Sequence, residues 1–204
     1  MVNVTREDST MSEDGGRRYG EASMIAAPFL TGERIYLRGL TEVDCAGPYL
    51  EWFNDAAVCR LNGHHQFPYH YTDATAFVKR VNASREMLVL AIVQRADHRH
   101  IGNVALHQID FISRSAEFAI VIGAQDCWGK GYSKEAGRLV LDHAFFSLNL
   151  HRVYCGTTEN NTPMQRLATY LGMREEGRRR QAMYKANGYL DVIEYSVLKR
   201  EYER

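Results

Sequence analysis

The chain has 204 residues, with 25 Lys or Arg and 25 Asp or Glu, so its formal net charge is zero. This balance removes the global electrostatic argument for a protein that binds nucleic acid or an acidic membrane surface. With 45% hydrophobic and 25% charged residues, the composition is that of a globular protein. The sequence contains no run of about 18 consecutive apolar residues, which excludes a membrane-spanning helix. We expect neither a nucleic-acid partner nor a membrane partner.

The N-terminal segment is polar and contains Gly15-Gly16 and Arg17-Arg18. It lacks the apolar segment of a secretory signal. We expect residues 1–28 to form a disordered polar leader and residues 29–204 to form one domain.

The first half of the chain alternates between the two-residue period of strands and the 3.6-residue period of helices. We expect a strand over residues 33–40 and a helix over residues 42–54. Thr41 and Asp44 fit the N-cap and the acidic third position of that helix. The elements expected next are a loop over residues 60–72, a helix over 72–84, and strands over 87–94, 101–110 and 116–123.

The second half continues the alternation. The elements expected are a helix from Tyr132 to about Leu148, a strand over 153–158, a helix over 163–171, and strands over 174–185 and 192–198. Asn187-Gly188 predicts a hairpin turn between the last two strands. The order β-α-α-β-β-β-α-β-α-β-β predicts an α/β domain with a mixed, largely antiparallel central sheet flanked by helices.

A glycine-containing loop separates a buried strand from the helix that starts near Tyr132. Gly129 and Gly131 allow a ligand to approach the backbone, and helix N-terminal amides favour phosphate or pyrophosphate. The spacing excludes a Walker A loop and a dinucleotide fingerprint, whose third glycine would fall at Lys134. A simple tight turn and a nucleotide-phosphate site remain as alternatives.

Several segments from about Leu30 to Tyr202 resemble one known family in the same order. They read GERIYLRGLTEVDCAGPYLEWFND, then IGNVALHQID with RSAEFAIVIG, then WGKGYSKEAGRLVLDHAF, and last LHRVYCGTTENNTPMQRLATYLGMREEGRRRQAMYKANGYLDVIEYSVL. They are similar to the GNAT superfamily of acetyl-CoA-dependent N-acetyltransferases, and within it to the branch of ribosomal-protein alanine and amino-sugar N-acetyltransferases. The resemblance implies a GNAT-type fold, acetyl-CoA as co-substrate and no metal.

In this family a Q/R-x-x-G-x-G/A loop holds the pyrophosphate of coenzyme A, and the aligned loop here begins at Asp126. The Asp126 carboxylate would repel phosphate, so main-chain amides carry the expected contacts. The residues implied at the loop are Trp128, Gly129, Lys130, Gly131, Tyr132 and Ser133. The strand residues implied to pair with pantetheine are Ala119, Ile120, Val121 and Ile122. Asn161 matches an asparagine that contacts the cofactor, and a helix N-cap is its structural alternative.

The resemblance also implies direct transfer of acetyl to a primary amine through a tetrahedral intermediate, without an acyl-enzyme. Glu117 matches a glutamate used as a base in this branch, and an ion pair with Arg114 is the structural alternative. The family tyrosine that protonates the leaving thiolate falls at Ala168, so it is missing here. Tyr170, two positions further on, is the remaining candidate for the general acid.

The loop after the first helices forms part of the acceptor pocket in this family. That position implies His65, Phe67, Tyr69 and Tyr71 as substrate-binding residues. We expect a small amine or an amino sugar as acceptor, with a protein N-terminus as the alternative. A catalytically degenerate acyl-CoA-binding module is a further alternative, and a homodimer is left open.

The cysteines and histidines do not fall at metal-binding spacings. No two of the four cysteines form a C-x-x-C pair, and the histidines of the 60–72 loop lack a completing ligand set. We therefore expect free thiols in a reducing cytosol, a cytoplasmic protein and no metal.

Overall fold

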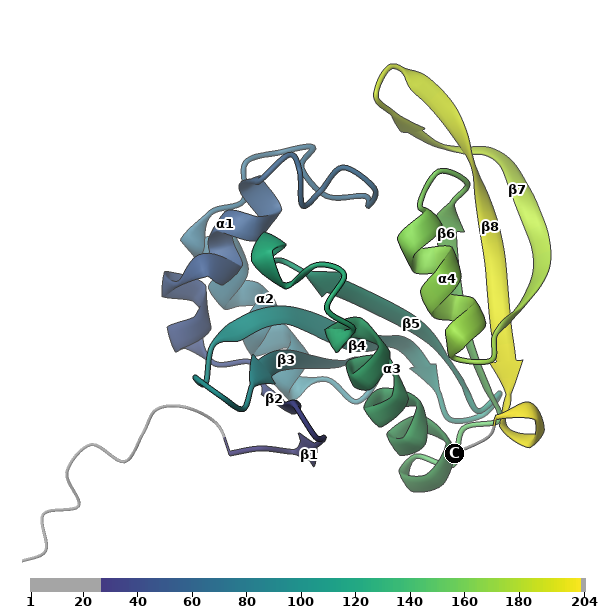
Figure 1. The fold of residues 1–204 in the computed structure, drawn as a ribbon, viewed down its shortest axis with the longest axis horizontal. Helices are drawn as coiled ribbons and strands as arrows, with labels where there is room; N and C mark the ends of the chain where they lie inside the picture. Colours follow the sequence, from purple (N-terminus) through teal and green to yellow (C-terminus); the bar gives the residue numbers. More distant parts are fainter. Residues whose placement is uncertain (1–26, 203–204) are drawn as a thin grey trace, which may run out of the picture.

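The computed structural model describes residues 27–202, shown as a ribbon in Figure 1. The expected leader lies outside the described residues, except for its last two positions. In the described part of the chain, no helix combines the length and the apolar character needed to cross a bilayer.

The described strands form one eight-stranded sheet in the order β1-β2-β3-β4-β5-β6-β8-β7. Their bounds are β1 Leu30–Thr31, β2 Ile35–Gly39, β3 Leu88–Gln94, β4 His100–Asp110, β5 Ser115–Ile122, β6 Arg152–Thr158, β7 Arg174–Lys185 and β8 Gly188–Leu198. β5 and β6 are parallel, and all other neighbouring pairs are antiparallel. The prediction of a mixed, largely antiparallel sheet is confirmed, with β1 as an additional edge strand.

Helices cover both faces of this sheet (Figure 1). The α-helices are α1 Pro48–Asn54, α2 Tyr71–Ala83, α3 Tyr132–Asp142 and α4 Thr162–Tyr170. Short 3-10 helices span Glu42–Ala46, Gln125–Cys127 and Lys199–Glu201, and a π-helical turn spans His143–Ser147. One buried apolar cluster joins α3 and α4 to the sheet, and a second cluster joins α1 and α2 to it.

The helix expected over residues 42–54 is wrong as one continuous element. Thr41 N donates to Asp44 Oδ2 at 2.8 Å, as the expected cap requires, but the 3-10 helix that follows is short. Gly47 adopts an extended conformation, with φ −110° and ψ −161°, and Pro48 then starts α1. Proline favours the first position of a helix because it has no N–H to leave unpaired there.

The long helix expected up to about Leu148 also differs from the structure. Regular α-helix ends at Asp142, and the π-helical turn continues the chain as far as Ser147.

The parallel strands β5 and β6 are paired only at their N-terminal ends. The partners are Ser115 with Arg152, Ala116 with Val153, and Glu117 with Tyr154. Both strands continue beyond these pairs, to Ile122 and to Thr158, without pairing with each other. The sheet therefore opens after Glu117 into a wedge between β5 and β6, and this wedge positions the site described next.

Candidate functional site

The backbone of β5 presents unpaired groups to the wedge. Gly123 N donates at 3.0 Å to a carbonyl oxygen of β4. Because backbone groups of successive strand residues alternate in direction, Ala119 and Val121 also face β4. Ile120 and Ile122 therefore direct their N–H and C=O groups into the wedge. Of the residues predicted to pair with pantetheine, Ile120 and Ile122 thus direct their backbone groups into the wedge. Ala119 and Val121 direct theirs to β4.

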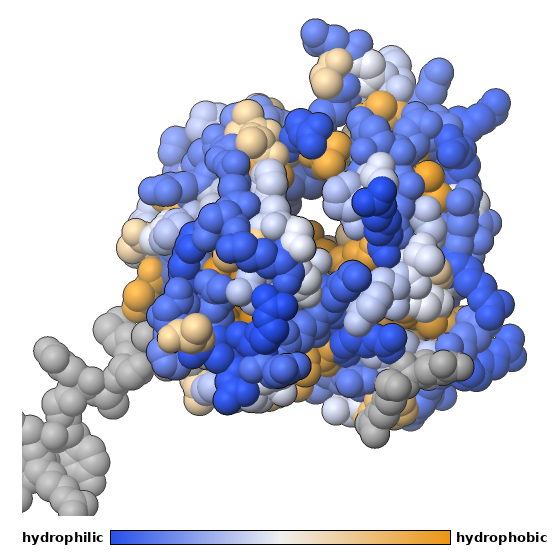
Figure 2. All heavy atoms as spheres, viewed as in Figure 1, coloured by the Kyte–Doolittle hydropathy of each residue, from blue (hydrophilic) through white to orange (hydrophobic). Residues whose placement is uncertain are grey.

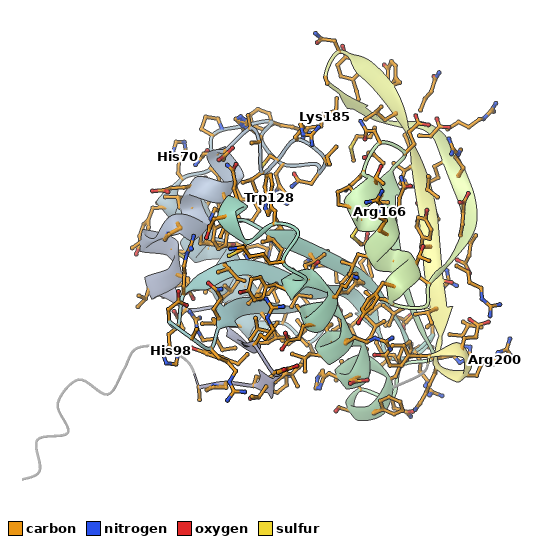
Figure 3. All side chains as sticks on the ribbon, in the orientation of Figure 1. His70, His98, Trp128, Arg166, Lys185 and Arg200 are labelled. Atoms are coloured by element: carbon orange, nitrogen blue, oxygen red, sulfur yellow. The ribbon has the colours of Figure 1, made fainter. Side chains whose placement is uncertain are left out.

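Trp128 lies at the mouth of this wedge (Figure 3). Its indole Nε1 donates to the Ile122 carbonyl at 2.7 Å, while 44% of the residue stays exposed. One backbone acceptor of the wedge is therefore already bonded to this loop side chain.

The glycine loop forms a cradle of backbone amides at the start of α3. Gly129 and Gly131 have φ of +72° and +85°, in the left-handed region that favours glycine. The Trp128 and Lys130 amides donate within the loop, each to the carbonyl three residues earlier, those of Gln125 and Cys127. In the described chain, the loop amides left without an acceptor are those of Gly129, Gly131, Tyr132 and Ser133. A Cβ on Gly129 would meet nothing within 4 Å, so this cradle has room for an anion.

Arg34 at the start of β2 holds this loop, although nothing in the sequence motif points to it. Its Nη1 donates to the Lys130 carbonyl at 2.9 Å, and its guanidinium lies 4.3 Å from the centroid of the Tyr132 ring. Glu135 Oε1 accepts from the Arg34 amide at 2.8 Å. In a trans peptide the C=O and the following N–H point in opposite directions, so Arg34 turns the Gly131 N–H away from itself.

The carboxylate of Asp126 does not stand unpaired beside the cradle. Arg99 donates to both Asp126 oxygens, at 2.7 and 2.8 Å. The hydrogen bond from Arg99 keeps the pKa of Asp126 below its usual range. The repulsion expected between Asp126 and phosphate is therefore offset by a neighbouring cation.

Glu117 lies at the last β5–β6 pair, where the wedge opens. Gln108 Nε2 donates to Glu117 Oε2 at 3.3 Å, and the Tyr154 hydroxyl donates to Gln108 Oε1 at 3.3 Å. Gln108 has φ +48° in a bulge of β4, which turns its side chain toward this group. Arg114 instead donates to the backbone and side-chain oxygens of Asn149.

Tyr170 lies on the other face of the sheet from Glu117. Its ring centroid is 4.5 Å from Lys134 Nζ and 5.3 Å from Arg138 Cζ, between α3 and α4. Ala168, where the family tyrosine falls, is fully buried in the cluster that joins these helices. The structure does not bring Tyr170 and Glu117 together, and a role of Tyr170 as general acid stays a prediction.

Asn161 uses both ends of its side-chain amide. Oδ1 accepts from the Met164 amide at 3.3 Å and caps α4, while Nδ2 donates to the Leu61 carbonyl at 3.4 Å. This connects the loop after α1 to the segment after β6. Its contact with a cofactor stays a prediction.

The loop after α1 contributes to two hollows at the surface. His65, Phe67 and Tyr69 line one of about 440 Å³, whereas Tyr71 starts α2 and is not among its lining residues. The second hollow, of about 570 Å³, lies between residues 63–66 and residues 182–186. Figure 2 shows the surface hollowed between these parts of the molecule.

Lys185 near the tip of the β7–β8 hairpin crosses to the same loop (Figure 3). Its Nζ donates to the carbonyls of Asn62 and His64, the latter at 3.1 Å. Asn161 and Lys185 thus tie the loop to the β6–β8 side of the wedge at two points.

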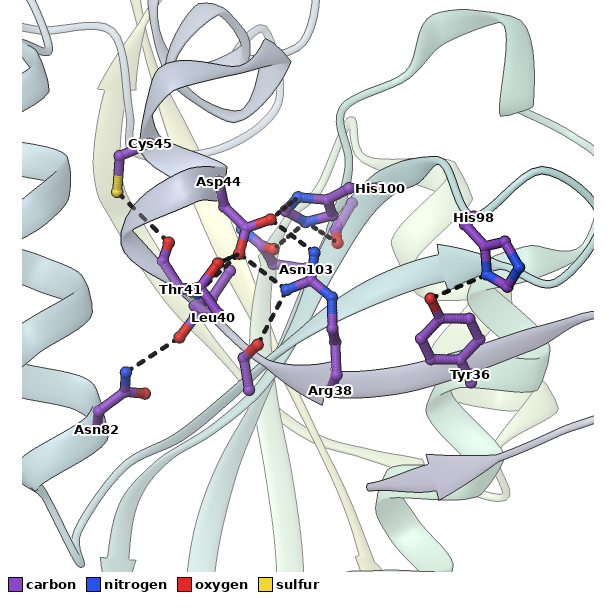
Figure 4. Close-up of polar contacts among 12 residues, drawn as sticks. Tyr36, Arg38, Leu40, Thr41, Asp44, Cys45, Asn82, His98, His100 and Asn103 are labelled. Atoms are coloured by element: carbon purple, nitrogen blue, oxygen red, sulfur yellow. Dashed lines mark hydrogen bonds and ion pairs between the residues drawn. The ribbon is translucent and has the colours of Figure 1, made fainter. Parts of the chain in front are cut away.

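A buried polar cluster lies on the α1 side of the sheet, near the end of β5 (Figure 4). Arg38 donates to both Asp44 oxygens at 2.7 and 2.8 Å, and His100 Nδ1 lies 3.3 Å from the same carboxylate. Burial opposes ionisation of Asp44, but hydrogen bonds from Arg38 and His100 hold its pKa far below the usual range. The Trp52 ring stacks edge-on to His100 and packs on Gly123, where a Cβ would lie 1.9 Å from it.

The described residues form neither a metal site nor a reactive thiol. Within residues 27–202, no three His, Cys, Asp or Glu side chains are grouped to hold a metal ion. The four cysteines are free and buried, and desolvation raises the pKa of Cys127 beside the loop. Such thiols are poor nucleophiles because the thiolate is disfavoured.

Comparison with known proteins gives a consistent result. The family model described as "Acetyltransferase (GNAT) domain" matches residues 34–174. An uncharacterized N-acetyltransferase, p20 of Bacillus licheniformis, is 28% identical over 83% of this chain and 96% of its own length. The spermidine N(1)-acetyltransferase of Vibrio cholerae is 34% identical over 54% of this chain and 64% of its own length.

Solved structures agree with the fold. The spermidine N-acetyltransferase of Vibrio cholerae in complex with CoA and spermine superposes with a TM-score of 0.76 at 24% identity, covering 83% of this chain and 98% of that one. RimJ of Mycobacterium smegmatis in complex with CoA-disulfide gives a TM-score of 0.74 at 20% identity, covering 83% and 84%. The fold expected from the resemblance is confirmed as the fold of these acetyltransferases.

Proposed function

The chain belongs to the GNAT family of acetyltransferases, and on that premise we propose that it transfers acetyl from acetyl-CoA directly to the primary amine of a small molecule. The observation that carries this proposal is the cradle of unpaired amides beside an open wedge in the sheet. The cradle suits a pyrophosphate, and the wedge suits an extended chain with amide groups. Acetyl-CoA contains a pyrophosphate followed by such a chain.

The residues that would hold acetyl-CoA follow from this geometry. The amides of Gly129, Gly131, Tyr132 and Ser133 would bind pyrophosphate, with the N-terminal charge of α3 adding to the attraction. The backbone of Ile120 and Ile122 would pair with the pantetheine amides as an added strand does. A backbone N–H that faces the wedge is also a suitable donor to the thioester oxygen as negative charge develops there.

The acceptor would reach the wedge from the side of the two hollows. Glu117 stands where the wedge opens and would accept a proton from the acceptor ammonium, since only the neutral amine is a nucleophile. Relatives named as spermidine acetyltransferases support a small amine as acceptor.

The test is an acceptor screen with the purified full chain. Acetyl-CoA is mixed with spermidine, an amino sugar and a peptide with a free N-terminus, and released coenzyme A is measured with a thiol reagent. We expect release with a small amine. Release with the peptide alone would contradict the small-molecule acceptor, and tight coenzyme A binding without release on any amine would indicate a non-catalytic binding module. Tighter binding of ATP than of coenzyme A would overturn the proposal altogether.

A further inference from the structure

His107 lies directly opposite Glu117 in the β4–β5 ladder. Directly opposite residues of an antiparallel pair share one face, with Cβ atoms about 5 Å apart. The ladder shifts register immediately after this pair, and Glu117 is also the last β5 residue paired with β6. His107 and Glu117 therefore form a neighbouring pair at the point where the wedge opens.

The surroundings of His107 favour its neutral form. Desolvation lowers the pKa of His107 and the charge of Arg80 on α2 lowers it further, while Glu117 acts in the opposite direction. His107 in turn acts on His64 of the loop after α1, whose pKa it lowers by repulsion. A neutral imidazole can take up a proton near neutral pH, which a cationic one cannot.

His64 extends this pair toward solvent. It lines both hollows and its ring packs edge-on to Phe53, with 4.7 Å between the ring centroids. Desolvation lowers the pKa of His64, and repulsion from Lys185 and from His107 adds to this shift. His107 thus lies beside Glu117 where the wedge opens, and His64 lines the hollows through which an acceptor would enter.

We propose that the proton released by the acceptor ammonium passes through Glu117 to His107 and from there to solvent. This inference rests on the proposed function and deepens it. The ammonium loses one proton along this route, and the amine lone pair then attacks the thioester carbonyl carbon to form the C–N bond. The C–S bond breaks when the resulting tetrahedral intermediate collapses. The electron pair goes to sulfur, which takes the second proton lost from nitrogen. One proton per acetyl group therefore reaches solvent.

The first experiment replaces His107 with Gln in the full chain and measures kcat/KM for the best acceptor against pH. We expect a loss of about 10- to 100-fold near neutral pH, because a positioned proton acceptor contributes about that much or more. Added imidazole should restore part of the rate, and the KM for acetyl-CoA should not change. His98→Gln is the matched control, because His98 is exposed and bonds to Tyr36 far from Glu117.

A second measurement on the unaltered protein covers the case in which the His107 variant fails to fold. The imidazole nitrogens of His107 are titrated by NMR, and we expect the midpoint to match the acidic limb of kcat/KM. A mismatch, or an unchanged rate and pH profile in a folded His107→Gln variant, would overturn the relay while leaving the acetyltransferase intact. Failure of the unaltered protein to acetylate any amine would instead overturn the proposed function and the relay with it.

Discussion

At the scale of single residues, two glycines decide which loop peptides face outward. Gly129 and Gly131 both have positive φ, and between them the Lys130 amide turns inward to the Cys127 carbonyl. The Gly131 amide is left without an acceptor in the described chain, on the side opposite Arg34. A side chain at Gly131 has space, because its Cβ would come no nearer to a neighbouring atom than 3.8 Å, the distance to Arg34 Nη1, so strain in φ is the main cost.

Gly131→Val should weaken binding of coenzyme A by roughly 30-fold, which corresponds to about 2 kcal/mol of strain at a positive φ. Isothermal titration of the folded variant measures the change. Gly177→Val is the matched control, because Gly177 also has open space but lies in β7 without a positive φ. Unchanged affinity in the folded Gly131 variant would remove the cradle from the site.

Sequence reasoning indicated those residues of the candidate site that belong to one local sequence pattern. The glycine spacing indicated the cradle, and the resemblance indicated Glu117. Arg34 and His107 were missed because their contacts are distant along the chain. Arg34 donates to a carbonyl 96 positions away, and His107 meets Glu117 only through the register of the sheet. No single-sequence pattern specifies such a register.

At the scale of elements, the start of β2 is coupled to the start of α3. The Arg34 and Ile35 amides both donate to Glu135 Oε1, at 2.8 and 3.3 Å, and the Arg34 guanidinium stacks on Tyr132. The Tyr132 hydroxyl in turn accepts from Gln94 Nε2 of β3 at 2.7 Å. The first turn of α3 is therefore bound to the start of β2 and to β3, which β4 and β5 separate from the wedge.

Arg34→Ala should raise the Kd for coenzyme A about tenfold, because the Lys130–Gly131 peptide loses the hydrogen bond and the stacked ring that orient it. Arg34→Lys should fail to restore the affinity, since an ammonium cannot reproduce the planar stack. Full rescue by Lys would instead indicate a purely electrostatic role. Arg95→Ala is the control: it removes the same charge, but the Arg95 guanidinium bonds the carbonyls of Gly32 and Glu33 instead of the glycine loop.

The β7–β8 hairpin and the loop after α1 are coupled in a similar way through Lys185. Lys185→Met keeps the aliphatic chain and removes the donors to Asn62 and His64. We expect the KM of the acceptor to rise about threefold to tenfold, at an unchanged KM for acetyl-CoA, because the loop is freed when both hydrogen bonds are lost, at a net cost of about 1 kcal/mol. Steady-state kinetics check this, with Lys199→Met as control, since Lys199 bonds Asn149 at the other end of β8. An equal change in the control would refute the coupling.

The elements themselves were largely predictable, and the exceptions have local causes. Hydrophobic periodicity located α2 and the strands from β2 to β7 within one or two residues, whereas β8 starts at Gly188, four residues before the expected start, and β1 was not predicted. The helix over residues 42–54 failed because Gly47-Pro48 permits a break that periodicity does not register. The divergence of β5 from β6 is also invisible in the sequence, because the period of each strand does not report where two strands distant along the chain stop pairing.

At the scale of the whole molecule, charge and burial make the stability depend on pH in two stages. Desolvation lowers the pKa values of His64, His107 and His143 from the ordinary 6.5. The hydrogen bond from Arg152 lowers the pKa of Glu176 from 4.5 to about 2. In every case the unfolded chain takes up the proton at a higher pH than the folded chain, so falling pH favours unfolding.

The melting temperature should therefore fall first as pH drops below about 6.5, where the histidines protonate in the unfolded chain, and again below about 4.5, as the carboxylates do. Scanning calorimetry over this range measures both stages. Arg152→Met should flatten the second stage by raising the pKa of Glu176 and leave the first unchanged. A melting temperature that rises as the solution is acidified would contradict the assignment.

The wedge has a mechanical consequence for the molecule. Between its two halves, from β1 to β5 and from β6 to β7, the sheet is continuous through three residue pairs only. Beyond them, the backbone of β5 lacks the neighbour that every interior strand normally has. A substrate lying in that gap would act as a missing strand, so the ligand is a structural component as well as a reactant. On the proposed function, bound acetyl-CoA would therefore join the two halves of the sheet along this gap.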